Sequence, residues 1–147
     1  MAVLGFVFSD VDTDRPDYDL YFKVYHHAEH MAYTYSIKND KLTVSQGFLS
    51  DDEGELLLNI RIDPNFILKI QKLKLEELEN NYYNKCILPT SGADYLIDIK
   101  DGERVKRIHL HHYYKEEVAK LADLINNEIP GEYEINYLDK DTEQNCK

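Results

Sequence analysis

The sequence has no tryptophan, two cysteines, four prolines and six glycines among its 147 residues. Six glycines leave little material for a loop that cradles phosphate groups, and neither the P-loop pattern nor the dinucleotide-binding pattern occurs. The G-x-S-x-G pattern of serine hydrolases is also missing. No motif therefore assigns the chain to a nucleotide-dependent enzyme or a serine hydrolase, and the sequence favours a protein without catalytic activity.

The cysteines are too few and too far apart to suggest a bonded framework. Cys86 and Cys146 show no C-x-x-C spacing, and Cys146 lies in a polar tail of the kind that is usually poorly ordered. Cys86 stands beside Ile87 and Leu88, which is typical of a small buried hydrophobic side chain. We therefore expect no disulfide.

Basic residues are also in deficit, with 17 lysines and arginines against 28 aspartates and glutamates and a formal charge of −11. A surface of this charge repels phosphate backbones and anionic lipid head groups, so the composition predicts neither a nucleic-acid partner nor a membrane partner. It is compatible with a basic protein partner or with divalent cations.

Long hydrophobic runs are missing as well. The apolar opening, residues 2–8, is too short to cross a bilayer and lacks the basic start of a secretion signal, so it predicts a first strand. This favours a cytoplasmic protein; a signal removed before the numbering begins would instead make it periplasmic or secreted.

What the chain does contain is ordinary for one globular domain, with 43% hydrophobic and 31% charged residues. A chain of this length buries a sizeable core without covalent staples. No internal repeat or linker interrupts it, so we expect a single domain over residues 1–138 and a polar C-terminal tail over residues 139–147.

Alternation of apolar and polar residues predicts antiparallel strands. They cover residues 20–25, 31–38, 42–44, 56–62, 95–99 and 105–110.

Two turns set the register of the predicted hairpins. A two-residue turn at Asn39-Asp40 places Ile37 opposite Leu42 and Tyr35 opposite Val44, so apolar side chains meet on one face. A four-residue loop around Asp101-Gly102 places Ile97 opposite Ile108 and Asp98 opposite Arg107.

Helices are predicted after the fourth strand and near the end of the chain. Asp63-Pro64 combines an N-cap with a first-turn proline, and apolar residues continue at helical spacing to Leu78. A second helix over residues 115–126 follows, whereas residues 80–92 read as a connection. The predicted fold class is α+β: an antiparallel sheet (β-meander, helix, β-hairpin, helix) with two helices packed on one face.

Histidines form two groups that could hold a divalent metal. Residues 26–30 match the H-x-x-E-H string of one class of zinc proteases, but they fall between two strands rather than on the helix that this chemistry needs. His109 and His111 project from one side of a strand and could share a metal ion. The candidate metal ligands, for zinc or another divalent metal, are His26, His30, His109 and His111; the alternative is that these are merely solvated polar residues.

Tyrosine is abundant, with 12 residues, and it is enriched at protein interfaces because its ring offers a large contact area and a polar tip. Several rings should lie exposed beside carboxylates. The candidate partner-binding residues are Tyr21, Tyr25, Asp51, Asp52, Glu53 and Tyr113.

These patterns lead to two hypotheses. The first is a non-catalytic protein that binds a basic protein through an acidic, tyrosine-bearing surface, as inhibitors and toxin-neutralising, immunity-like proteins do. The second is a metal-dependent hydrolase or metal-binding protein that uses the histidine groups. Salt-dependent capture of a partner supports the first hypothesis, and bound metal at neutral pH supports the second.

Overall fold

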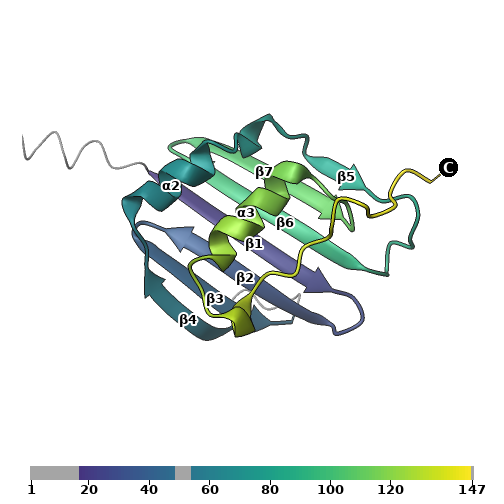
Figure 1. Cartoon of the computed structure of the whole chain (residues 1–147), viewed down its shortest axis with the longest axis horizontal. Helices are drawn as coiled ribbons and strands as arrows, with labels where there is room; N and C mark the ends of the chain where they lie inside the picture. Colours follow the sequence, from purple (N-terminus) through teal and green to yellow (C-terminus); the bar gives the residue numbers. More distant parts are fainter. Residues whose placement is uncertain (1–16, 49–53, 147) are drawn as a thin grey trace, which may run out of the picture.

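The computed structural model describes residues 17–48 and 54–146. The predicted opening strand over residues 2–8 lies outside this part of the chain. The described residues form one mixed sheet of seven strands with helices and a long C-terminal segment (Figure 1). Among them, no helix has the length and apolar character needed to cross a membrane.

The sheet has the strand order β4-β3-β2-β1-β6-β7-β5. Every pair of neighbouring strands is antiparallel except β5 and β7, which are parallel. The α+β class with a mainly antiparallel sheet is therefore confirmed. The strands are β1 (Tyr18–His26), β2 (Met31–Lys38), β3 (Lys41–Gly47), β4 (Glu55–Arg61), β5 (Asn81–Tyr83), β6 (Ala93–Asp101) and β7 (Arg104–His111).

Both predicted hairpin registers are confirmed. Ile37 pairs with Leu42 and Tyr35 with Val44 across β2 and β3. Ile97 pairs with Ile108 and Asp98 with Arg107 across β6 and β7. In each hairpin the apolar pairs share one face. A shift of one residue would move every apolar side chain to the opposite face, so burial of the apolar face specifies the register.

Helix α2 (Pro64–Gln71) begins where the sequence predicts, since the Asp63 side chain accepts a hydrogen bond of 2.8 Å from the Asn65 backbone N–H. It is shorter than predicted. Lys74 has a left-handed backbone with φ 55°, and a 3-10 helix, η1 (Leu75–Glu77), follows. Leu78, the last apolar residue of the predicted helix, is buried at the end of this separate turn and not in a continuous helix.

Helix α3 (Glu116–Asn126) matches the prediction to within one residue. Figure 1 shows α2 and α3 lying over the same side of the sheet. Their buried residues, such as Ile70 and Leu121, belong to one core cluster with the strand residues Leu20, Phe22 and Ile97. We call the opposite side of the sheet, which carries Tyr21 and the other alternate strand residues, the second face.

Two features in the second half of the chain correct the sequence predictions. Residues 80–92, predicted as a connection, contain β5, which is only three residues long and so leaves no periodicity to detect. The expected absence of a disulfide is wrong, because Cys86 and Cys146 are bonded to each other. The fold brings these two residues together although 60 positions separate them in the sequence.

Candidate metal centre

Asp94 is the second residue of β6, and its side chain lies on the second face because its neighbours Ala93 and Tyr95 are buried in the core. The antiparallel register places His111 of β7 directly opposite Asp94 on one side. On the other side, Tyr25 of β1 is opposite Asp94, and His27 follows two residues later. Three adjacent strands therefore deliver two histidines to one carboxylate.

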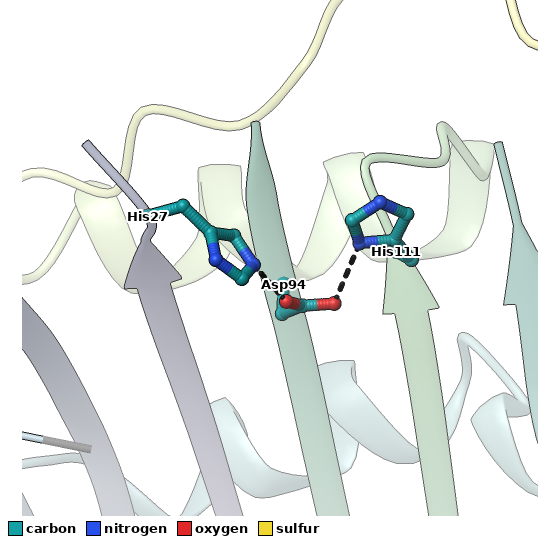
Figure 2. A group of neighbouring side chains, drawn as sticks. All are labelled: His27, Asp94 and His111. Atoms are coloured by element: carbon teal, nitrogen blue, oxygen red, sulfur yellow. Dashed lines mark hydrogen bonds and ion pairs between the residues drawn. The ribbon is translucent and has the colours of Figure 1, made fainter. Parts of the chain in front are cut away.

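The side chains point toward one another with the carboxylate in the middle (Figure 2). His27 Nε2 lies 2.5 Å from Asp94 Oδ2, and His111 Nδ1 lies 2.9 Å from Asp94 Oδ1. A third ring, His109, places its Nε2 atom 2.7 Å from the same Oδ1 atom. One ligand atom from each of His27, Asp94 and His111 lies within 4.8 Å of the others, a grouping that could hold a metal ion.

The hydrogen bonds of His111 bear on what lies between its ring and Asp94. Its Nε2 atom lies 3.0 Å from the Leu88 carbonyl oxygen, which can only accept, so Nε2 carries a proton. In a neutral ring the Nδ1 atom would then present a lone pair to the Asp94 carboxylate. Two acceptors do not attract each other at 2.9 Å, so either a second proton or a metal ion lies between them.

The next question is whether the Asp94 carboxyl is ionised. Burial opposes ionisation of the Asp94 carboxyl, but hydrogen bonds from His109, His111 and His27 outweigh that effect and hold its pKa below the usual range. The carboxyl is therefore ionised at neutral pH.

The centre is closed on one side and open on another. The exposed fractions of the side chains are 2% for His111, 17% for Asp94, 20% for His27 and 42% for His109. The Tyr25 ring meets His27 edge-on at 4.8 Å between centroids, and the Tyr83 ring covers His111 at 4.9 Å. Solvent therefore reaches the centre mainly beside His109.

The loop at residues 84–92 contacts both His111 and His27 through backbone carbonyl groups. Its Leu88 carbonyl orients the His111 ring, and its Gly92 carbonyl accepts a hydrogen bond of 3.1 Å from the His27 backbone N–H. Histidine ligands of metals commonly direct their second ring nitrogen at such a carbonyl, which sets the tautomer and the ring orientation. His111 already has this arrangement.

Of the four predicted metal ligands, the structure brings His109 and His111 to the centre. His26 does not join them, because it pairs with the buried Ala93 and shares its side of the sheet. His30 lies in the turn between β1 and β2 with φ 54°, and it is exposed.

Sequence reasoning missed His27 and Asp94. The signal for Asp94 was present, because extending the predicted β6–β7 register from Asp98 and Arg107 places Asp94 opposite His111. His27 gave no such signal, since it follows the end of β1.

Of the predicted partner-binding residues, Tyr21, Tyr25 and Tyr113 lie in the described part of the chain. Tyr21 is partly exposed on the second face, whereas Tyr25 is almost buried beside His27. Tyr113 stacks on Tyr82 at 5.3 Å and packs against the core. Asp51, Asp52 and Glu53 lie outside the described residues.

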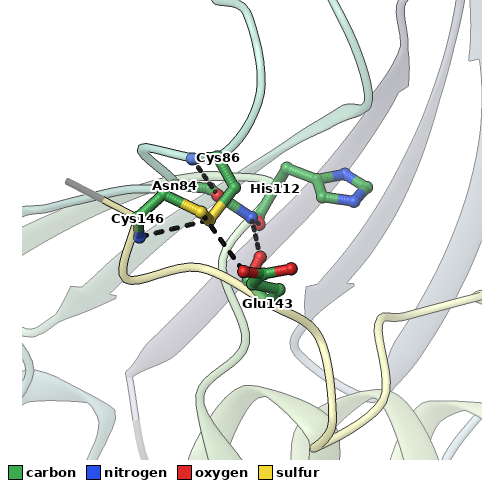
Figure 3. Close-up of a disulfide and its surroundings, with 5 residues drawn as sticks. All are labelled: Asn84, Cys86, His112, Glu143 and Cys146. Atoms are coloured by element: carbon green, nitrogen blue, oxygen red, sulfur yellow. Dashed lines mark hydrogen bonds between the residues drawn. A yellow bond between two sulfur atoms is a disulfide. The ribbon is translucent and has the colours of Figure 1, made fainter.

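Cys86, Cys146 and Glu143 form a second group with metal-ligand chemistry. The two sulfur atoms are bonded to each other, so this group is not available to a metal ion while the disulfide is intact (Figure 3). The centre around Asp94 is the stronger candidate.

Comparison of the sequence with models of known protein families finds no match, and comparison with curated proteins finds no similar sequence. The geometry of the chain is therefore what indicates its function.

Proposed function

We propose that this protein binds a divalent transition metal ion of the zinc class through His27, Asp94 and His111. The observation that carries the proposal is the arrangement of His111, whose Nε2–H is engaged by Leu88 while Nδ1 faces the ionised Asp94 carboxylate across 2.9 Å. A metal ion would replace the proton that this arrangement otherwise requires.

The ligand set indicates which metals to test. Two imidazole nitrogens and one carboxylate oxygen suit zinc and neighbouring transition metals, whereas calcium and magnesium prefer oxygen ligands alone. Three protein ligands leave at least one position for water or for His109, which lies at the open side of the centre. The proposal is for binding without an assigned reaction.

The test is calorimetric titration of the chelator-treated, oxidised protein with zinc chloride. We expect one zinc ion per chain and no comparable heat with calcium chloride. Asp94→Asn, which keeps the shape of the side chain, and His27→Ala, at a partly exposed position, should each weaken zinc binding at least tenfold. At a zinc concentration about 100 times the Kd, binding should stabilise the wild-type fold by about 2.7 kcal/mol.

His30→Ala is the matched control, because His30 is an exposed histidine of the β1–β2 turn and does not belong to the group of His27, Asp94 and His111. Its zinc affinity should equal that of the wild type. The proposal is wrong if the wild type binds no zinc, or if His30→Ala reduces binding as much as His27→Ala does.

Binding of a basic protein partner is the second candidate, and one hollow favours it. The hollow lies between the β1–β2 hairpin and the C-terminal segment and is lined by three glutamates and three tyrosines. Such a surface suits a lysine or arginine side chain. The lining includes Glu29, Glu132, Glu134, Tyr33, Tyr35 and Tyr133.

A fluorescent oligo-arginine peptide is a suitable probe for this second candidate. Its affinity should fall steeply with salt and should drop in a Glu132→Gln/Glu134→Gln variant, because ions screen the attraction and the substitutions remove two charges. Equal binding by the wild type and the variant would contradict the candidate.

The disulfide also bears on location. Disulfides persist in oxidising compartments and are rare in the cytosol, so we propose a non-reducing compartment in place of the cytoplasm that the sequence had suggested.

A further inference from the structure

We infer that the Cys86–Cys146 disulfide regulates the metal site proposed above, on which this inference rests. The oxidised protein binds the metal ion tightly, and reduction of the disulfide lowers its affinity for the ion. The disulfide belongs to a different group of side chains from His27, Asp94 and His111. It acts through the loop at residues 84–92, which contacts both histidines.

The first link runs from the loop to the metal centre. The Leu88 carbonyl lies 3.0 Å from His111 Nε2, and the Gly92 carbonyl accepts from the His27 backbone N–H at 3.1 Å. The loop therefore sets the ring orientation of one ligand and the backbone position of the other. Partners of this kind, outside the ligands themselves, typically account for 10-fold to 100-fold in metal affinity.

The second link joins the loop to the C-terminal segment. The disulfide bonds Cys86 to Cys146, and the Lys85 N–H donates to the Gln144 carbonyl oxygen across a long 3.4 Å. Figure 3 shows the disulfide beside the loop and the end of the chain. The Asn84 side chain adds a hydrogen bond of 3.0 Å to the Glu143 carbonyl oxygen. Of these ties the disulfide is the covalent one, and Leu88 lies only two residues beyond Cys86.

The third link fixes the C-terminal segment to the connection between β7 and α3. The Gln144 side chain accepts a hydrogen bond of 2.8 Å from the Tyr114 N–H, and its amide donates to the Tyr114 carbonyl at 3.3 Å. Asn84 donates to the carbonyl oxygens of Glu143 and His112 at 3.0 Å and 2.7 Å. The disulfide thus ties the loop to a held segment, so it limits the motion of the Leu88 carbonyl.

The switching step is a thiol–disulfide exchange with an external dithiol. A thiolate of the dithiol attacks one sulfur of the disulfide, and its second thiol then releases the protein sulfur, so Cys86 and Cys146 become thiols while the dithiol becomes a disulfide. Both cysteines are partly exposed, so a reductant can reach them. The loop then gains freedom, and the preorganisation of His111 is lost.

The test compares zinc affinity in the oxidised wild type and in Cys86→Ser/Cys146→Ser, measured by competition with a chromophoric chelator. Serines are needed because a dithiol reductant would itself bind zinc, and because free thiols beside Glu143 could form a competing site. We expect the Kd for zinc to rise tenfold or more in the variant. Amide hydrogen exchange should also quicken at Ser91, whose N–H donates to the Leu88 carbonyl.

Tyr35→Phe is the control, because it removes the 2.7 Å hydrogen bond from the Tyr35 hydroxyl to the Tyr133 carbonyl and leaves the disulfide intact. It should leave the zinc Kd unchanged. A Kd within twofold of wild type in the double serine variant, or an equal loss in Tyr35→Phe, would overturn the inference. Should the double variant fail to fold, wild-type protein reduced by a phosphine and alkylated at both thiols serves in its place.

The same titrations separate this inference from the proposed function. If the oxidised wild type binds zinc through Asp94 and the double serine variant binds it equally well, only the redox control is refuted. If the oxidised wild type binds no zinc, the metal site itself is refuted.

Discussion

Replacement of both cysteines by serine should lower the free energy of unfolding by about 4 kcal/mol. The disulfide joins residues that are 60 positions apart, so it removes much of the freedom of the unfolded chain. The loop-closure relation gives about 14 cal/mol/K for a loop of this length, which is about 4 kcal/mol at 25 °C. Unfolding 147 residues carries an entropy of about 310 cal/mol/K, so the melting temperature should fall by about 13 °C.

Differential scanning calorimetry and urea denaturation without metal measure this change. The urea m-value should rise in the variant, because an uncrosslinked unfolded chain exposes more surface. The folded variant should keep the far-ultraviolet circular dichroism of the wild type, since the hydrogen bonds of Asn84 and Gln144 remain. A loss below about 1 kcal/mol, or an unchanged melting temperature after reduction of the wild type, would refute the loop-closure argument.

Two further predictions concern the surroundings of the loop. Burial, followed by the nearby His111, lowers the pKa of His112 below 6.5, so its contribution to stability is complete above about pH 6.5 and is lost as the pH falls through the folded-state pKa. In His112→Asn, the asparagine tolerates the positive φ and can still accept a hydrogen bond from the Ala93 N–H. This variant should show a smaller difference in unfolding free energy between about pH 7.5 and about pH 5.5, measured by urea denaturation in the presence of EDTA. An unchanged difference would exclude His112 as its source. Gly92→Ala should lower the free energy of unfolding by about 3 kcal/mol, because the φ of Gly92 is +72° and a Cβ would lie 2.4 Å from His112 Nδ1. Gly102 has a similar φ of +64° but open space around it, so Gly102→Ala should lower the free energy of unfolding by about 1 kcal/mol in the same urea assay. Equal losses at the two glycines would show that the close contact with His112 relaxes without cost.

The strands and helices followed from local patterns because their causes are local. The alternation in β1 and β2, the Asn39-Asp40 turn and the Asp63 cap depend on residues that are neighbours in the sequence. The registers of both hairpins could be derived as well, since a short turn leaves few ways to match apolar pairs. β5 could not be predicted, because it has three residues and pairs in parallel with β7, far along the chain.

The candidate centre was predictable in part. His109 and His111 were identified as neighbours on one strand, and the hairpin register already implied a place for Asp94 opposite His111. The H-x-x-E-H string indicates His26 and His30 and passes over His27, although the string forms a turn and not a helix. The pairing of β1 with β6, which crosses the whole meander and helix α2, brings His27 to Asp94.

The sequence alone determined an acidic α+β domain with a mainly antiparallel sheet, two helices and no motif for a familiar reaction, because composition and periodicity reflect which residues are buried. The tertiary structure decided which distant side chains meet. It placed β1 between β2 and β6, joined Cys86 to Cys146 and gathered His27, Asp94 and His111 around one point. Contacts between residues that are far apart in the chain arise from the packing of whole elements, and no local pattern of residues encodes them.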